Sequence, residues 1–185
     1  MPTASLHDRL PALRKWIETI VETHRPAARP VASLGFPRLG HYFSADFLNL
    51  TLLVEVEHVA KPPLSALGLH QFADFEQVNS AAITYLDLCL VDRNRVADEA
   101  LLFHELVHAV QWQVLGTERF ILAYALGHIS GRGYEGNPFE VIARQLESRF
   151  VHQASTFRVE PIVKQHLDQV APTLLSAADA LLRRP

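Results

Sequence analysis

The sequence predicts one domain over residues 1–185 of the α+β class, in which a small, mostly antiparallel sheet precedes an active-site helix and further helices. Three observations support this. Apolar residues recur at helical spacing in 6–24, two apolar runs with strand character occupy 48–59 and 81–91, and the helical period returns after Asp92. The 185 residues match one ordinary domain, and 49% hydrophobic residues suffice for a buried core.

Charge and composition exclude several classes of protein. A net charge of −3 gives no basic footprint for nucleic acid or for an anionic membrane surface. The apolar runs are shorter than the ~18 residues of a membrane span. The N-terminal segment mixes charged residues and prolines with its apolar residues, which is not typical of a signal peptide. Cys89 is the only cysteine, which excludes an internal disulfide and a zinc site with two thiolates. We therefore expect a soluble, cytoplasmic protein that binds neither nucleic acid nor membranes.

The chain begins with a helix that leads into the sheet region, residues 31–91. Residues 6–24 form an amphipathic helix, which ends at the proline-rich breaker 25–30. A short extended piece is expected over 31–36, followed by a loop over 37–45.

Two segments have the composition of strands. The run 48–59 is rich in Leu and Val, and its alternation of apolar and acidic residues at 54–57 suits a strand with one wet face. Residues 64–80 show no clear pattern. The mostly apolar run 81–91 predicts a second, buried strand.

A long helix follows the second strand. Asp92 or Asn94 can cap a helix over 95–115, and Gly116 supplies a left-handed stop. The remaining helices are expected within 119–183.

Three further helical segments are predicted after this helix. A short helix covers 119–126, and the glycine-rich stretch 127–136 is a loose connection. Asn137 caps a helix that Pro138 opens and that extends to about Gln153. The last helical stretch covers 160–182, where Pro172 kinks or splits it.

The long helix carries the pattern His-Glu-x-x-His at residues 104–108. His104 and His108 are four residues apart, so they project from the same face of a helix one turn apart. Two imidazoles in this arrangement can bind one zinc ion at about 2.0–2.1 Å. Glu105 lies beside the first histidine, within reach of a water held by the metal, and is predicted to be the general base.

At these residues the sequence resembles the zincin metallopeptidases, whose core is a small sheet followed by an active-site helix with this motif. The resemblance is carried by 104–108 and extends over about 80–150. It implies Zn²⁺ as the cofactor and a peptide or protein as the substrate.

Differences between this sequence and two zincin subfamilies indicate which subfamily it resembles. Metzincins carry a third histidine where this chain has Val114, a glycine where it has Gln111, and a methionine turn that is impossible because Met1 is the only methionine. Aspzincins carry an aspartate where this chain has Phe120. The resemblance is therefore to compact gluzincins, in which a glutamate from a later helix completes the zinc site.

Glu140 is the predicted third ligand, because it lies in the first turn of a helix within an Asn-Pro-x-Glu-x-x-Ala segment that resembles such proteins. Its spacing from Asn137 also fits a capping box, in which the carboxylate would only satisfy backbone donors. Glu135 and His128 are alternative ligands. Glu147 lies two turns further on, where a solvated or salt-bridged role is expected.

A peptidase also needs a donor for the developing oxyanion and groups that orient its histidines. Tyr134 is the first candidate for the donor, a catalytic role, and His128 and Arg132 are alternatives in the same loop. Asp98 and Gln111 are candidates for orienting the histidines.

The sequence thus predicts a zinc-dependent hydrolase, and specifically a peptidase. His104, His108 and Glu140 bind Zn²⁺, and Glu105 takes the proton of the attacking water. The short chain leaves little for a second lobe, so the sheet edge, the 127–136 loop or a protein partner would complete the substrate cleft. The alternative is a regulatory or binding module that keeps a zincin fold without turnover.

Overall fold

The computed structural model describes residues 6–152, 155–170 and 172–183. Its helices are α1 (Leu6–His24), α2 (Ala45–Leu50), α3 (Ala73–Gln77), α4 (Glu99–Leu115), α5 (Thr117–Ser130), α6 (Pro138–Val151), α7 (Val159–Val170) and α8 (Pro172–Leu182). Its strands are β1 (Arg29–Pro30), β2 (Leu52–Val56), β3 (Ala82–Tyr85) and β4 (Leu88–Asp92). This order of elements confirms the predicted α+β class.

The four strands form one sheet in the order β1-β2-β4-β3. The outer pairings, β1 with β2 and β3 with β4, are antiparallel, as predicted. The central pairing of β2 with β4 is parallel, which the prediction of a mostly antiparallel sheet did not anticipate. A parallel pair needs a crossover connection, and the chain between 57 and 81 provides it before entering at the edge strand β3.

The single strand predicted over 81–91 is wrong, because the chain turns back within it. Tyr85 pairs with Leu88, so Leu86 and Asp87 form a two-residue hairpin loop between β3 and β4. Leu86 has φ of 58°, a left-handed conformation that hairpin loops usually assign to Gly, Asn or Asp. The sequence therefore carried no turn signal here. An ion pair of 2.7 Å from Asp87 to Arg25 helps to hold the loop.

The predicted strand 48–59 and the predicted extended piece 31–36 are also corrected. Ser44 accepts a hydrogen bond from the backbone N–H of Phe47 and so caps α2, which takes the first part of the Leu-rich run. The strand is therefore confined to β2. The extended segment that pairs with β2 lies before the predicted piece, in β1, and residues 31–33 form a 3-10 turn instead.

The helix α4 begins later than predicted. Asp92 ends β4, and its side chain accepts a hydrogen bond from Asn94 N–H at 2.8 Å in a turn rather than capping a helix. Asp98 is the N-cap, accepting from Leu101 N–H at 3.0 Å. The predicted stop is confirmed, because Gly116 has φ of 73°.

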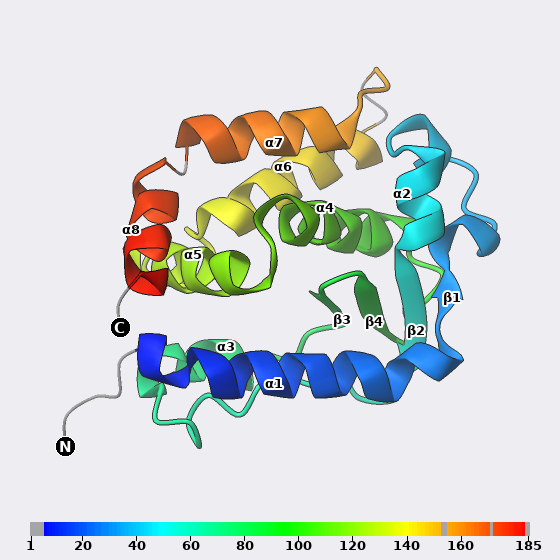
Figure 1. Cartoon of the computed structure of the whole chain (residues 1–185). Helices are drawn as coiled ribbons and strands as arrows, with labels where there is room; N and C mark the ends of the chain where they lie inside the picture. The colour runs from blue at the N-terminus through cyan, green and yellow to red at the C-terminus, as the bar shows by residue number, and fades with distance from the viewer. Residues whose placement is uncertain (1–5, 153–154, 171, 184–185) are drawn as a thin grey trace.

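Helix α4 lies at the centre of the molecule, above the sheet in Figure 1, with α6 and α7 on its far side and α1 running below the sheet. Trp112 of α4 donates a hydrogen bond from its Nε1 to the carbonyl oxygen of Thr84 in β3 at 3.0 Å. Twelve of the 17 residues of α4 are buried, including the polar His104, Glu105, His108 and Gln111. Buried polar groups require partners, so this helix must be met by polar groups from its neighbours.

Helices α5 and α6 meet at Asn137, which is fully buried. Its side chain accepts a hydrogen bond from Phe139 N–H and donates to the carbonyl of Tyr124, both at 3.2 Å. A Cβ at position 127 would lie 2.6 Å from the Asn137 oxygen, so Gly127 permits this contact. The junction sets the position of the first turn of α6, which carries Glu140.

The C-terminal helices agree with the predicted segments in most respects. Helix α5 is longer than the predicted 119–126 and includes the first glycine of the stretch expected to be a connection. Asn137 caps α6 as predicted, while the predicted end at Gln153 lies outside the described residues. The stretch 160–182 is split into α7 and α8, and Pro172 begins α8. No helix in the described part of the chain is both long and apolar enough to cross a bilayer.

Replacing Phe103 with alanine should destabilise the fold by about 3–5 kcal/mol, because a large cavity would form in the core. Phe103 is fully buried and stacks on Phe150, with ring centroids 4.4 Å apart. The free energy of unfolding in urea would measure this effect. Leu50→Ala is the control, since Leu50 is 67% exposed and should change stability by less than about 0.5 kcal/mol. Equal effects of the two variants would contradict the packing described here.

Candidate metal centre

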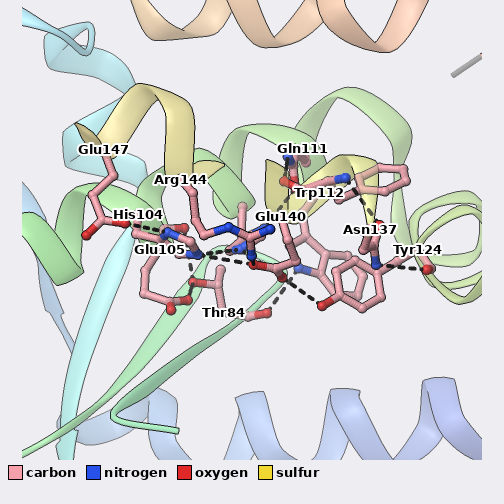
Figure 2. A network of polar contacts seen from close by, with 12 residues as sticks. Thr84, His104, Glu105, Gln111, Trp112, Tyr124, Asn137, Glu140, Arg144 and Glu147 are labelled. Carbon is pink, nitrogen blue, oxygen red and sulfur yellow. Dashed lines mark hydrogen bonds and ion pairs between the residues drawn. The ribbon is translucent and has the colours of Figure 1, made fainter. Parts of the chain in front are cut away.

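Two helices bring three candidate ligand residues together at the centre of the molecule. One turn of α4 places Nε2 of His104 3.1 Å from Nε2 of His108. The first turn of α6 places the two carboxylate oxygens of Glu140 3.3 Å from these nitrogens, one oxygen facing each histidine. Figure 2 shows His104 and Glu140 pointing toward one another from the two helices. All three residues are buried, and within the described residues they form the one group suited to hold a metal.

The spacing of these atoms fits a single metal ion. Ligand atoms arranged tetrahedrally around zinc at about 2.0 Å lie about 3.3 Å from one another. The two imidazole nitrogens lie 3.1 Å apart, close to that edge length, and each lies 3.3 Å from a different oxygen of Glu140. One ligand atom from each of the three residues lies within 4.8 Å of the other two. Oε2 of Glu140 is buried and accepts no hydrogen bond from the described residues, so it has coordination capacity to spare. Two imidazoles and one carboxylate form a donor set that suits zinc.

Electrostatics favour positive charge at this point. Burial lowers the pKa of His104, but Glu140, Glu147 and Glu105 outweigh burial and raise it to about 10. Burial lowers the pKa of His108 as well, and the charge of Glu140 brings it above its usual value. Burial raises the pKa of the Glu140 carboxyl, yet His108 and His104 hold it well below its usual range. The Glu140 carboxylate therefore stays ionised, and its negative charge can be balanced either by protons on the two imidazoles or by a metal ion.

The outer nitrogen of each histidine is held by an acceptor. The Nδ1 of His104 lies 3.0 Å from a carboxylate oxygen of Glu147, and the Nδ1 of His108 lies 2.8 Å from the amide oxygen of Gln111. The amide nitrogen of Gln111 donates to the carbonyl of Phe139 at 3.0 Å, which defines the orientation of the amide. Each Nδ1 can therefore donate to its acceptor, and each Nε2 offers a lone pair to the centre when the imidazole is neutral.

These contacts decide between the predicted orienting residues. Gln111 orients His108, as predicted, whereas Asp98 caps α4 instead. Glu147 makes an ion pair with His104, so the expectation of a salt-bridged role is confirmed. That it orients a candidate ligand was not predicted, although its position seven residues after Glu140 on one helix face was a usable signal.

The predicted general base, Glu105, is buried beside this cluster. Its carboxylate accepts a hydrogen bond of 2.7 Å from the hydroxyl of Thr84, a residue of the edge strand β3. The same hydroxyl lies 3.1 Å from the backbone carbonyl of Glu105 and 3.4 Å from the sulfur of Cys89. Thr84 was missed by the sequence analysis, although a polar residue at a buried position in an apolar strand is a signal for such a role.

Two tyrosines approach Glu140 from the α5 side. The hydroxyl of Tyr124 donates to Oε1 of Glu140 at 2.7 Å, and burial together with the charge of Glu140 raises the pKa of Tyr124 well above its usual value. Tyr134, the predicted oxyanion donor, is half-buried, and burial and Glu140 raise its pKa in the same way. Both phenols therefore remain protonated donors. Tyr124 was not predicted, because its spacing gives no signal.

The alternative ligands lie outside the cluster. The side chain of Glu135 is 88% exposed and makes an ion pair with Arg144. His128 is buried, but its Nε2 lies 3.1 Å from a carboxylate oxygen of Asp74 in α3. The carboxylate of Glu140 faces the histidines, so the capping-box alternative with Asn137 is not observed. Arg132, an alternative oxyanion donor, is exposed, with φ of 57°.

The candidate ligands and Glu105 open onto a cavity of about 140 Å³. Tyr134 lines this cavity too, so the predicted donor shares a space with the predicted ligands. The walls come from α1, the segment 62–75, β3 and α5, which are all parts of this chain. A protein partner that completes the cleft stays a prediction.

No protein family, curated protein or solved structure matches this chain. The assignment of the site therefore rests on its own geometry.

Zinc binding should release protons, because both imidazoles must be neutral to act as ligands. The acidic neighbours that raise the pKa of His104 to about 10 keep it protonated near neutral pH. Apparent zinc affinity should therefore rise with pH, about tenfold per pH unit for each proton released. Calorimetry in buffers of different ionisation enthalpy would count the protons. An affinity that does not change between about pH 6 and about pH 8 would contradict the described electrostatics.

Glu147→Gln should weaken zinc binding by about 10–100-fold, because it removes the carboxylate that orients His104. Competition with a chelator of known affinity would measure the change. Glu135→Gln is a matched control, since Glu135 is a glutamate with an 88% exposed side chain outside the cluster. Unchanged zinc affinity in Glu147→Gln would contradict the role of Glu147 in orienting His104.

Proposed function

We propose that this protein is a zinc-dependent hydrolase of the zincin type and that it cleaves peptide bonds. The observation that carries the proposal is the convergence of the two Nε2 atoms of His104 and His108 with both oxygens of Glu140, at 3.1–3.3 Å, on the wall of a cavity that Glu105 also lines. Two histidines with one glutamate are the protein ligands of open, catalytic zinc sites, whereas structural sites are closed by four.

The proposed roles divide between the metal and the side chains. A zinc ion held by these ligands would supply Lewis acidity, which makes water a nucleophile near neutral pH. Glu105 would accept the proton of that water and deliver it to the leaving amine, which amide hydrolysis requires. Thr84 holds the Glu105 carboxylate at 2.7 Å and so restricts its orientation.

Stabilisation of the developing oxyanion is assigned to Tyr134. Its phenol lines the cavity, and its raised pKa keeps it a donor. The guanidinium of Arg144 lies 5.4 Å from the centroid of the Tyr134 ring, which supports the ring from the α6 side. Tyr124 is bound to Glu140 and is assigned to holding that carboxylate.

Glu105→Gln should keep one zinc per chain and lower peptide cleavage by about 10²–10⁴-fold, because the amide cannot accept the proton of water. Metal content would be measured by elemental analysis and cleavage with a fluorogenic peptide library. Glu135→Gln should keep both zinc and activity, since that residue lies outside the cluster.

Cleavage by Glu105→Gln at the wild-type rate would contradict the assignment of the base. Zinc binding by the wild type without cleavage of any library member would favour the alternative, a binding module that retains the metal. Absence of zinc from both proteins would contradict the metal site itself.

A further inference from the structure

The cavity beside the candidate metal centre is polar at the metal centre and largely apolar elsewhere. Leu13 and Ile17 of α1, Phe72 and Phe75 around α3, and Ala125 of α5 are among the apolar groups that line it. Leu13 and Ile17 are buried, with exposed fractions of 6% and 3%, so the cavity extends into the core. It is therefore more than a shallow depression over the metal centre.

The volume of this cavity limits the size of the group that can bind in it. Its volume is about 140 Å³. An apolar cavity of about 150 Å³ lined by leucine, isoleucine and phenylalanine stays free of water and binds benzene. One aromatic ring or one branched aliphatic side chain is thus the matching group.

The charged residues that line the cavity indicate whether a charged or an uncharged group can bind in it. Among the described residues that line the cavity there is no lysine, arginine or aspartate. Its two acidic residues, Glu105 and Glu140, already have assigned partners in Thr84 and the histidines. Away from the metal centre, a charged group would lose its hydration against apolar side chains without gaining a partner, which is strongly unfavourable.

We propose that this cavity binds one uncharged apolar side chain of the substrate, that of phenylalanine or leucine, at the residue next to the scissile bond. The inference rests on the proposed function in one respect, which is that the metal centre marks the scissile bond. The part of the proposal that concerns a benzene-sized apolar group is argued from the lining and volume of the cavity alone.

Binding can be tested without turnover. Toluene is the probe, and calorimetry on the full chain measures its affinity. The wild type should bind toluene, and Ala125→Leu, which fills the cavity from α5, should weaken binding at least about tenfold. Ala177→Leu is the control, because the same change lies on an exposed position of α8. An unchanged thermal unfolding midpoint would show that Ala125→Leu is folded.

Specificity is tested with peptides that differ at one residue. A phenylalanine next to the cleaved bond should raise kcat/KM at least about tenfold over alanine, and glutamate or lysine should lower it further. Phe75→Ala enlarges the cavity and should shift the preference from phenylalanine toward tryptophan. Phe36→Ala is the matched control, since Phe36 is also half-buried and does not line this cavity.

The outcomes separate the two proposals. Toluene binding that Ala125→Leu removes, together with no cleavage of any peptide, would refute the peptidase and leave the apolar binding site standing. Equal cleavage of phenylalanine, alanine and glutamate peptides would overturn the specificity. Absence of toluene binding to the wild type would overturn the cavity as a binding site.

Discussion

The structure depends on one buried carboxylate between two imidazoles. Glu140 is 3% exposed, and a carboxylate at that depth is stable only when positive charge or a metal ion accompanies it. His104 and His108 supply the partners, and their own outer nitrogens are satisfied by Glu147 and Gln111. The centre of the protein is thus a polar network enclosed by aromatic and aliphatic residues, and each member limits the orientation of the next.

The network also explains how the helices are arranged. Gln111 of α4 contacts both His108 and the carbonyl of Phe139 in α6, so the same side chain orients a candidate ligand and joins two helices. Asn137 joins α6 to α5 in the same manner, by way of the Tyr124 carbonyl. The first turn of α6 is therefore fixed from two sides, which brings the Glu140 carboxylate to the histidines.

Local patterns in the sequence predicted the parts of the site that local geometry controls. The i, i+4 spacing of His104 and His108 is enough to place them on one helix face. Glu140 could be proposed because its segment has helix-capping residues and resembles a known arrangement. Thr84 and Tyr124 could not be placed, since their contacts depend on how a strand and a separate helix meet α4. The hairpin at Leu86 was not predicted for another reason. Leu86 adopts a left-handed backbone conformation, which residues with a branched side chain disfavour and which the folded structure imposes.

The wall that α1 contributes to the cavity has a consequence for folding. The apolar face of α1 includes Leu13 and Ile17, and it lies against α5 in the folded chain. An ion pair links Arg14 to Glu118, 104 residues later. A contact of such sequence separation closes late and slows folding. This wall of the cavity is therefore complete only when two segments far apart in the sequence have come together, at a cost in chain entropy that the packing of α1 must offset.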